Sequence, residues 1–377
     1  MIDPKVFFDA LISNDVRFFA GVPDSLLKDF CACIAENSPA DGHLISANEG
    51  AAVACVSGYH LATGKTGLVY MQNSGIGNAL NPLVSLADPD VYHIPLLLVI
   101  GWRGEPGTKD EPQHVKQGKI TLGLLETSGI PYEVLDGAAA DVRSVVSRAC
   151  GNIRDTGRAY AFVVRDKTFA PYPVKAAAGA HEKYPLTRED AIRAVVDGLS
   201  GADILVSTTG KASRELYEYR VALKQGHQSD FLTVGSMGHS SQIALGIALQ
   251  KKGVQVFCLD GDGAAIMHMG SMATAGAKAP GNFRHIIINN GAHDSVGGQK
   301  TVGFEIDFVR IAEGCGYKWI ARAQSMEELV KAVRDIRSSD GPSFLEIRVN
   351  TGSRKELGRP KETPVANKIA FMEALST

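Results

Sequence analysis

The sequence predicts an α/β protein with two domains, each built on a mainly parallel sheet that helices cover on both faces. Short apolar runs of strand length alternate with longer helical stretches along the whole chain, which is the pattern of such sheets. The 377 residues exceed one domain of ordinary size and suit two. The 40 glycines and the hydrophobic content of 45% fit a globular chain with many tight strand-to-helix turns.

The expected elements alternate in both halves of the chain. Strands are expected at residues 18–21, 43–46, 67–71, 95–101, 161–165, 204–207, 254–259, 285–289 and 343–349. Helices are expected at residues 3–14, 49–63, 188–199, 240–251 and 325–338. Residues 171–185 are rich in proline and alanine and lack a periodic core pattern, which predicts a linker between domains of residues 1–170 and 186–377. The polar residues 352–364 form either a surface tail or a cover for the site.

Composition excludes several classes of protein. With 39 basic against 41 acidic residues, no nucleic-acid or anionic-membrane partner is expected. The longest apolar run, residues 94–100, is too short to cross a bilayer. The N-terminus lacks the basic region and cleavage site of a signal peptide. Six scattered cysteines without a CxxC pair fit reduced core thiols, so we expect a cytoplasmic protein.

A polar motif follows each of two expected strands between residues 254 and 290. The first strand ends in Gly-Asp-Gly at 261–263, and the second ends in a pair of asparagines. The carboxyl ends of parallel strands build the ligand crevice of such sheets. Asp262 and Asn290 offer the oxygen ligands that suit Mg²⁺, and Gly261 and Gly263 let the backbone approach a phosphate. The alternative is a turn aspartate that caps a helix beginning near Ala264, which leaves the asparagines unexplained.

Three further segments carry candidate site residues. Glu49 follows an expected strand and opens a small-residue helix, where the helix dipole alone would also favour it. Met237 lies between glycines in T-V-G-S-M-G-H, and ordinary core packing is its alternative role. Residues 73–77 form a polar, glycine-containing loop after a buried strand, which by itself is a weak phosphate motif. Basic side chains gather in a long expected loop at 101–121 and in a second loop at 293–301.

These motifs resemble those of the thiamine diphosphate (ThDP) enzymes, in which GDG is followed somewhat under thirty residues later by NN. The run N-E-G-A-A ending in G-Y at residues 48–59 also matches that family. The resemblance implies a pyrimidine-binding first domain and a diphosphate-binding second domain. It further implies that Mg²⁺ is held by the side chains of Asp262 and Asn290 and the backbone carbonyl of Ala292.

The resemblance also assigns roles to the cofactor-binding residues. Glu49 would hydrogen-bond N1′ of the aminopyrimidine, where a raised pKa helps proton transfer near neutrality. Met237 would hold the cofactor in its bent conformation. The remaining cofactor contacts implied are Asn73, Ser74, Gly75, Gly235, Ser236, Gly261, Gly263 and Ala264. In this family the site lies between the first domain of one subunit and the second domain of another, so self-association as a dimer or higher oligomer is expected.

Within the family, the chain resembles a branch without a middle domain, the phosphonopyruvate and sulfopyruvate decarboxylases. Residues 18–30, 72–83, 102–121 and 293–301 carry this resemblance. Sulfopyruvate enzymes are commonly split into two subunits, so the fused chain favours decarboxylation of 3-phosphonopyruvate to phosphonoacetaldehyde and CO₂ by ylid and enamine chemistry in phosphonate biosynthesis. The alternatives are a sulfopyruvate decarboxylase and a catalytically inactive ThDP-fold binding or regulatory protein. The candidate substrate residues are Arg103, His114, Lys116, His239, His293 and Lys300.

Overall fold

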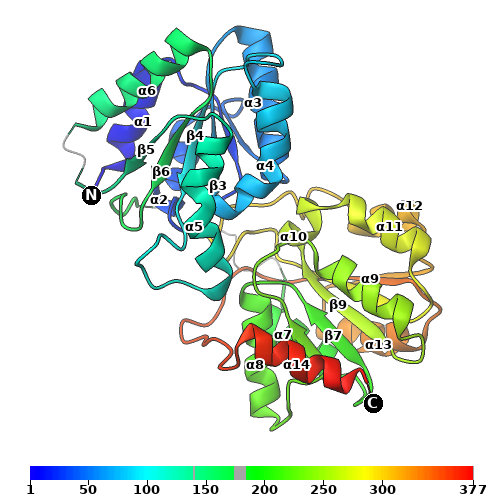
Figure 1. The fold of residues 1–377 in the computed structure, drawn as a ribbon. Coiled ribbons are helices and arrows are strands. Elements are labelled where there is room, and N and C mark those ends of the chain that lie inside the picture. The colour runs from blue at the N-terminus through cyan, green and yellow to red at the C-terminus, as the bar shows by residue number, and fades with distance from the viewer. Residues whose placement is uncertain (139–140, 174–183, 377) are drawn as a thin grey trace. The chain divides into compact units, whose positions relative to one another are not determined.

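The computed structural model describes residues 1–138, 141–173 and 184–376. The chain divides into two compact units, Met1–Ala176 and Ala177–Thr377 (Figure 1). Most of the expected linker, residues 174–183, lies outside the described residues. Each unit contains a six-stranded sheet in which all strand pairs are parallel, so the predicted α/β class is confirmed. Within the described part of the chain, every helix is too short or too polar to cross a membrane.

The first unit is built on a sheet of strand order β2-β1-β3-β4-β6-β5. Its strands are β1 (Phe19–Gly21), β2 (His43–Ile45), β3 (Gly67–Gln72), β4 (Leu96–Gly101), β5 (Tyr132–Leu135) and β6 (Tyr160–Val164). Its helices are α1 (Pro4–Ser13), α2 (Lys28–Asn37), α3 (Glu49–Thr63), α4 (Ile76–Pro82), α5 (Pro112–Thr127) and α6 (Val142–Thr156), with short turns η1 (Asn73–Gly75) and η2 (Leu83–Ala87).

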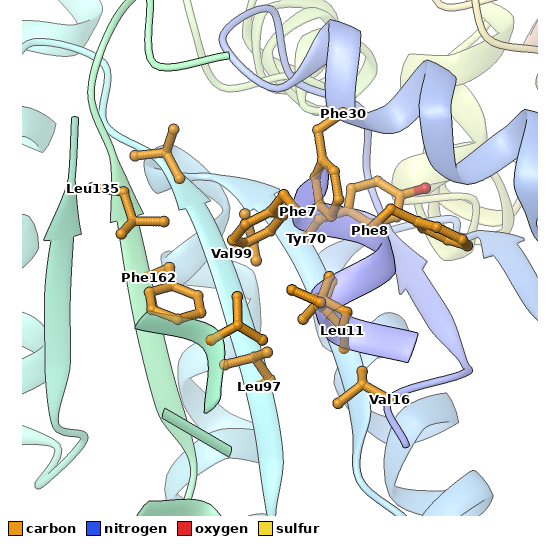
Figure 2. Close-up of a cluster of buried hydrophobic side chains, with 14 of the residues drawn as sticks. Phe7, Phe8, Leu11, Val16, Phe30, Tyr70, Leu97, Val99, Leu135 and Phe162 are labelled. Carbon is orange, nitrogen blue, oxygen red and sulfur yellow. The ribbon is translucent and has the colours of Figure 1, made fainter. Parts of the chain in front are cut away.

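Strand β4 shows how the first sheet is covered on both faces. All of its residues are buried, and successive side chains point to opposite sides. Leu97 and Val99 pack into a cluster with side chains of α1, α2 and α6, whereas Leu98 and Ile100 pack with those of α3 and α4. Figure 2 shows part of the first cluster, in which Phe7 of α1 lies beside Val99 of β4 and Phe8 points to the opposite side, beside Tyr70 of β3.

The second unit is built on a sheet of strand order β11-β12-β10-β9-β7-β8. Its strands are β7 (Ile204–Ser207), β8 (Asp230–Leu232), β9 (Val256–Gly261), β10 (Phe283–Asn289), β11 (Trp319–Ala323) and β12 (Ser343–Arg348). Its helices are α7 (Arg188–Asp197), α8 (Lys211–Ala222), α9 (Ser240–Gln250), α10 (Asp262–Met267), α11 (Gly270–Lys278), α12 (Phe308–Cys315), α13 (Met326–Ser338) and α14 (Pro364–Ala374). Phe257 and Leu259 of β9 pack with α7, α8 and α13, and Val256 and Cys258 pack with α9, α11 and α12.

The structure also differs in detail from the expected elements. The loop expected at 101–121 contains the start of α5, whose buried positions are mostly small or polar (His114, Gly118 and Thr121, with Leu125 as the large apolar residue) and therefore give no amphipathic pattern. The helix expected near Ala264 begins at Asp262, directly after β9. The short strands β5, β8 and β11 were not expected, because runs of three to five residues give little periodicity.

Candidate active site

The carboxyl ends of β9 and β10 bring Asp262 and Asn290 to one edge of the second sheet. The two strands are neighbours, with Gly261 paired to Ile288, so the residues that follow emerge side by side. Asp262 is 2% exposed, and its carboxyl group accepts hydrogen bonds from the Thr301 hydroxyl and from backbone N–H groups that include those of Asn290 and Gly263, but from no cationic side chain among the described residues. Burial raises its pKa to about 6. A buried carboxylate without a cation is costly, and a divalent metal would remove that cost.

The two asparagines of the NN motif have different roles. Asn289 is fully buried, and its amide donates to the Gly303 carbonyl at 2.6 Å and to Glu346 at 2.8 Å. Its Oδ1 accepts from Gly291 N at 3.1 Å, so this side chain serves the turn itself. Asn290 donates to Asp294 at 2.8 Å, and its Oδ1 accepts the Ala292 N–H at 3.0 Å. Each amide oxygen accepts one N–H and keeps a second lone pair, so the Asn290 oxygen can also bind a metal.

A loop of left-handed residues lies beside the Gly-Asp-Gly turn. Gly235, Ser236 and Gly238 have φ values of 70°, 46° and 85°, a conformation that lets successive backbone N–H groups converge on an anion. A side chain at Gly238 would meet the Ala264 carbonyl at 2.9 Å. A side chain at Gly263 would meet the His293 ring at 3.0 Å and the Met237 methyl at 3.5 Å. The structure therefore gathers these expected cofactor residues around the start of α10.

The basic side chains of the second unit differ in what they can offer an anion. His293 is half-buried, and desolvation lowers its pKa to about 4, so near neutrality it is a neutral hydrogen-bonding group rather than the cation we expected. His239 is exposed and contacts His268, with ring centroids 4.4 Å apart and ring planes tilted by 46°. Lys300 is exposed on the 293–301 loop. Lys211, half-buried at the start of α8, was not among the expected residues, and burial lowers its pKa.

Residues after β7 were also missed, although the signal was present. The run T-T-G-K follows the expected strand at 204–207, the same arrangement that drew attention to Gly-Asp-Gly. The Thr208 hydroxyl is buried without a hydrogen-bond partner among the described residues, and the Thr209 hydroxyl accepts from Gly235 N at 3.0 Å. A buried donor without a partner at the edge that carries Asp262 fits a site for an anionic ligand.

In the first unit, Glu49 lies at the start of α3 in a closely packed cradle. Asn48 caps the helix by accepting the Ala51 N–H at 2.9 Å, which leaves the Glu49 carboxyl group free of capping. That group is 5% exposed, accepts from Asn78 Nδ2 at 2.8 Å, and has its pKa raised by burial. A methyl group on Gly75 would lie 2.5 Å from the Glu49 Cδ, so glycine is required there. Asn78 was missed because nothing local marks it.

The structure gives several other expected residues of the first unit internal partners. Asn73 is buried and donates to the Arg103 carbonyl at 2.8 Å and to Thr121 at 2.9 Å, whereas Ser74 is exposed. The Arg103 guanidinium group forms a bidentate ion pair with Asp110 and also donates a hydrogen bond to the Ser25 hydroxyl at 2.9 Å. On α5, His114 is buried and Lys116 is exposed. Asn73 and Arg103 therefore brace a loop against α5, and Lys116 remains an accessible cation.

Comparison with known proteins identifies a family domain in each half of the chain. The N-terminal TPP binding domain of thiamine pyrophosphate enzymes matches residues 4–122, and the C-terminal TPP binding domain matches residues 208–347. The chain belongs to the thiamine pyrophosphate enzyme family. Thiamine pyrophosphate is the same cofactor as thiamine diphosphate, so the family predicted from the sequence is confirmed.

Three relatives match this chain over nearly its full length. A phosphonopyruvate decarboxylase of Streptomyces viridochromogenes is 35% identical and covers 100% of this chain and 96% of its own length. A phosphonopyruvate decarboxylase of Streptomyces hygroscopicus is 34% identical, over 97% of this chain and 92% of its own. A sulfopyruvate decarboxylase of Methanosarcina acetivorans is 27% identical, over 94% and 93%.

Proposed function

We propose that this protein is a ThDP- and Mg²⁺-dependent 2-oxo acid decarboxylase that converts 3-phosphonopyruvate to phosphonoacetaldehyde and CO₂ in phosphonate biosynthesis. The proposed substrate is supported by the full-length similarity to two phosphonopyruvate decarboxylases, which are 35% and 34% identical to this chain, against 27% for the sulfopyruvate decarboxylase. A phosphonate also agrees with the half-buried Lys211 and the exposed Lys116 and Lys300, because a substrate with two anionic groups needs more cations than pyruvate.

The residues at the end of β9 fit a magnesium ion. Asp262 and Asn290 supply one carboxylate and one amide oxygen, and the Ala292 carbonyl is the third proposed ligand. Such a set leaves positions for water and phosphate oxygens, which Mg²⁺ usually keeps. Gly235, Ser236, Met237, Gly261, Gly263 and Ala264 are the proposed cofactor contacts of this unit, with Asn73, Ser74 and Gly75 in the first unit. Bound ThDP would supply an electron sink for the carbanion that decarboxylation leaves.

Glu49 is the proposed catalytic residue because it is a buried carboxyl group whose pKa burial raises, which favours its protonated form. Burial raises its pKa, and the Asn78 amide fixes Oε2 at 2.8 Å, which leaves Oε1 to donate or accept the proton. Asn78 thereby orients the carboxyl group. Because Gly75 has no side chain, it leaves room for the Glu49 carboxyl group.

The test of this proposal is CO₂ release from 3-phosphonopyruvate, sulfopyruvate and pyruvate at equal concentration with ThDP and Mg²⁺. We expect a strong preference for phosphonopyruvate. A preference for sulfopyruvate would keep the fold, cofactor and Glu49 but overturn the substrate. Thermal stabilisation by ThDP with Mg²⁺ but not by NAD or ATP tests cofactor binding separately. Stabilisation without turnover of any of the three substrates would favour the inactive ThDP-fold alternative.

Two further parts of the proposal concern the cell and the assembly. Self-association follows from the family resemblance, which predicts a site shared by two subunits. A cytoplasmic location is proposed because all six cysteines are free, as in proteins of reducing compartments. Light scattering of the purified protein tests the assembly, and a monomer with full activity would contradict it.

A further inference from the structure

The carboxylate of Asp294 is a junction of three structural elements in the second unit. Its Oδ2 accepts hydrogen bonds from Asn290 Nδ2 at 2.8 Å, from Arg188 Nη1 at 2.9 Å and from the backbone N–H of Gly352 at 3.0 Å. The side chain is only 10% exposed. One oxygen therefore links the loop after β10, the start of α7 and the segment that follows β12.

Rigid elements hold this carboxylate in place. Arg188, 8% exposed, is the first residue of α7 and forks onto the buried Glu215 of α8 through two hydrogen bonds of 2.7 Å. Bidentate pairs of this kind fix the plane of a guanidinium group. Its remaining Nη1 points at Asp294, and Nη2 also reaches the Gly352 carbonyl at 3.2 Å. The position of Asp294 is therefore set by two helices and not by its own loop.

The chemistry of the two side chains decides which way the Asn290 amide faces. A carboxylate only accepts hydrogen bonds, so the NH₂ group of Asn290 must face Asp294. On its other side, Asn290 Oδ1 meets the Ala292 N–H at 3.0 Å, which only donates. A rotation of the amide by half a turn would place its NH₂ group against the Ala292 N–H and its oxygen against the Asp294 carboxylate, so both contacts would be lost. Both contacts therefore direct the oxygen away from Asp294.

We propose that Asp294 is a positioning residue that fixes the Asn290 amide so that its oxygen, and not its nitrogen, is presented to Mg²⁺. This inference rests on the proposed role of Asn290 as a metal ligand. Outer groups that orient metal ligands typically change metal affinity by about 10- to 100-fold when they are removed. Arg188 acts one step further out, by holding Asp294.

The alternative is that Asp294 only anchors the segment after β12. That segment has a second anchor of the same kind: Arg354 pairs with Glu189 and Glu218, and Glu218 accepts the Gly358 N–H at 2.6 Å. Neither Glu189 nor Glu218 touches Asn290 among the described contacts. Glu218→Ala is therefore a matched control that loosens the same segment and leaves the metal loop alone.

The experiment is a calorimetric titration of Mg²⁺ into the full-length, EDTA-treated protein at saturating ThDP. Asp294→Ala should weaken Mg²⁺ binding by about 10- to 100-fold. Asp294→Asn should stay within a few-fold of wild type, because its amide oxygen can occupy the place of Oδ2. Glu218→Ala should leave the affinity unchanged. At saturating Mg²⁺, the Asp294→Ala variant should recover most of its turnover.

A rescue variant sharpens the test. Asn290→Asp presents oxygen in either orientation, so adding it to Asp294→Ala should restore much of the lost Mg²⁺ affinity. Unchanged Mg²⁺ affinity in folded Asp294→Ala, or an equal loss in Glu218→Ala, would overturn the inference. If Asp294→Ala loses its native circular dichroism spectrum, Asp294→Ser replaces it, since a serine hydroxyl is too short to reach all three donors. A wild-type protein that binds no Mg²⁺ would refute the metal assignment, and with it this inference.

Discussion

Replacing Glu49 by glutamine tests the proposed catalytic residue with the least disturbance of the fold. The two side chains have the same shape, and glutamine cannot take up or release a proton. Its Oε1 can still accept the Asn78 hydrogen bond that wild type makes at 2.8 Å. The cradle formed with Gly75 is unchanged, because no atom is added. We therefore expect a folded protein that binds ThDP and loses most of its turnover.

The expected effects on activity and on stability have different sizes and directions. A positioned general acid or base contributes about 10²- to 10⁴-fold in rate, or about 3–5 kcal/mol of activation free energy. For stability, the pKa of Glu49 is raised in the folded protein, so its contribution is present below the unfolded pKa and lost as pH rises through the folded pKa. Glutamine does not ionise, so the variant does not lose this stability as pH rises. At pH 8 the variant should therefore be at least as stable as wild type.

The assay compares turnover of 3-phosphonopyruvate with thermal unfolding for the same preparations. Glu327→Gln is the control, since Glu327 is an exposed glutamate in the first turn of α13 and its loss removes the same charge from a helix start. We expect normal rates in that control. Near-wild-type turnover in Glu49→Gln would refute the proton-transfer role, and a large loss of stability would show that Glu49 is mainly structural.

Three further predictions concern the cradle, a buried carboxylate and the assembly. Gly75→Ala should lower turnover by about 10²-fold, because the added methyl group displaces the Glu49 carboxyl group. Gly77→Ala is the control, since a methyl group there meets no atom within 4 Å. Equal turnover in the two variants would contradict the packing argument. Burial raises the pKa of Asp24 to about 6, so the stability that this group contributes is lost as pH rises from 4 to 6. The free energy of unfolding of Asp24→Asn, measured by denaturant titration, should therefore rise by up to about 3 kcal/mol relative to that of wild type between pH 4 and pH 8. A difference between the two proteins that does not change with pH would contradict this. Mixing and refolding Glu49→Gln with Asp262→Ala, each inactive alone, should restore activity if the site is shared between subunits, and no recovery in proven mixed oligomers would place both residues in one chain.

Much of the fold and part of the site follow from local sequence. The continuous apolar runs at β4, β9 and β10 identify buried parallel strands wherever they pack. The placement of Asp262 and Asn290 at one sheet edge follows from the rule that polar residues after parallel strands share an edge. Helix α5 could not be predicted from the sequence, because its buried positions are mostly small and polar and give no amphipathic pattern.

The roles of individual side chains were decided by partners far away in the sequence. Asn289 and Asn290 are the same residue type, yet their amide groups have different partners. The Asn289 NH₂ group donates to Glu346 of β12 and to the Gly303 carbonyl, whereas that of Asn290 donates to Asp294. Arg103 was an expected substrate cation, and the structure pairs it with Asp110. Asp294 gained its place through Arg188, more than a hundred residues earlier.

The sequence by itself therefore determined the fold class, the family and the sheet edge at which Asp262 and Asn290 meet, since these depend on period, glycine turns and strand ends. Only the tertiary structure decided which polar groups are free to act. The physical reason is that a hydrogen-bonding group has few valences, and distant residues use them once the strands and helices are assembled.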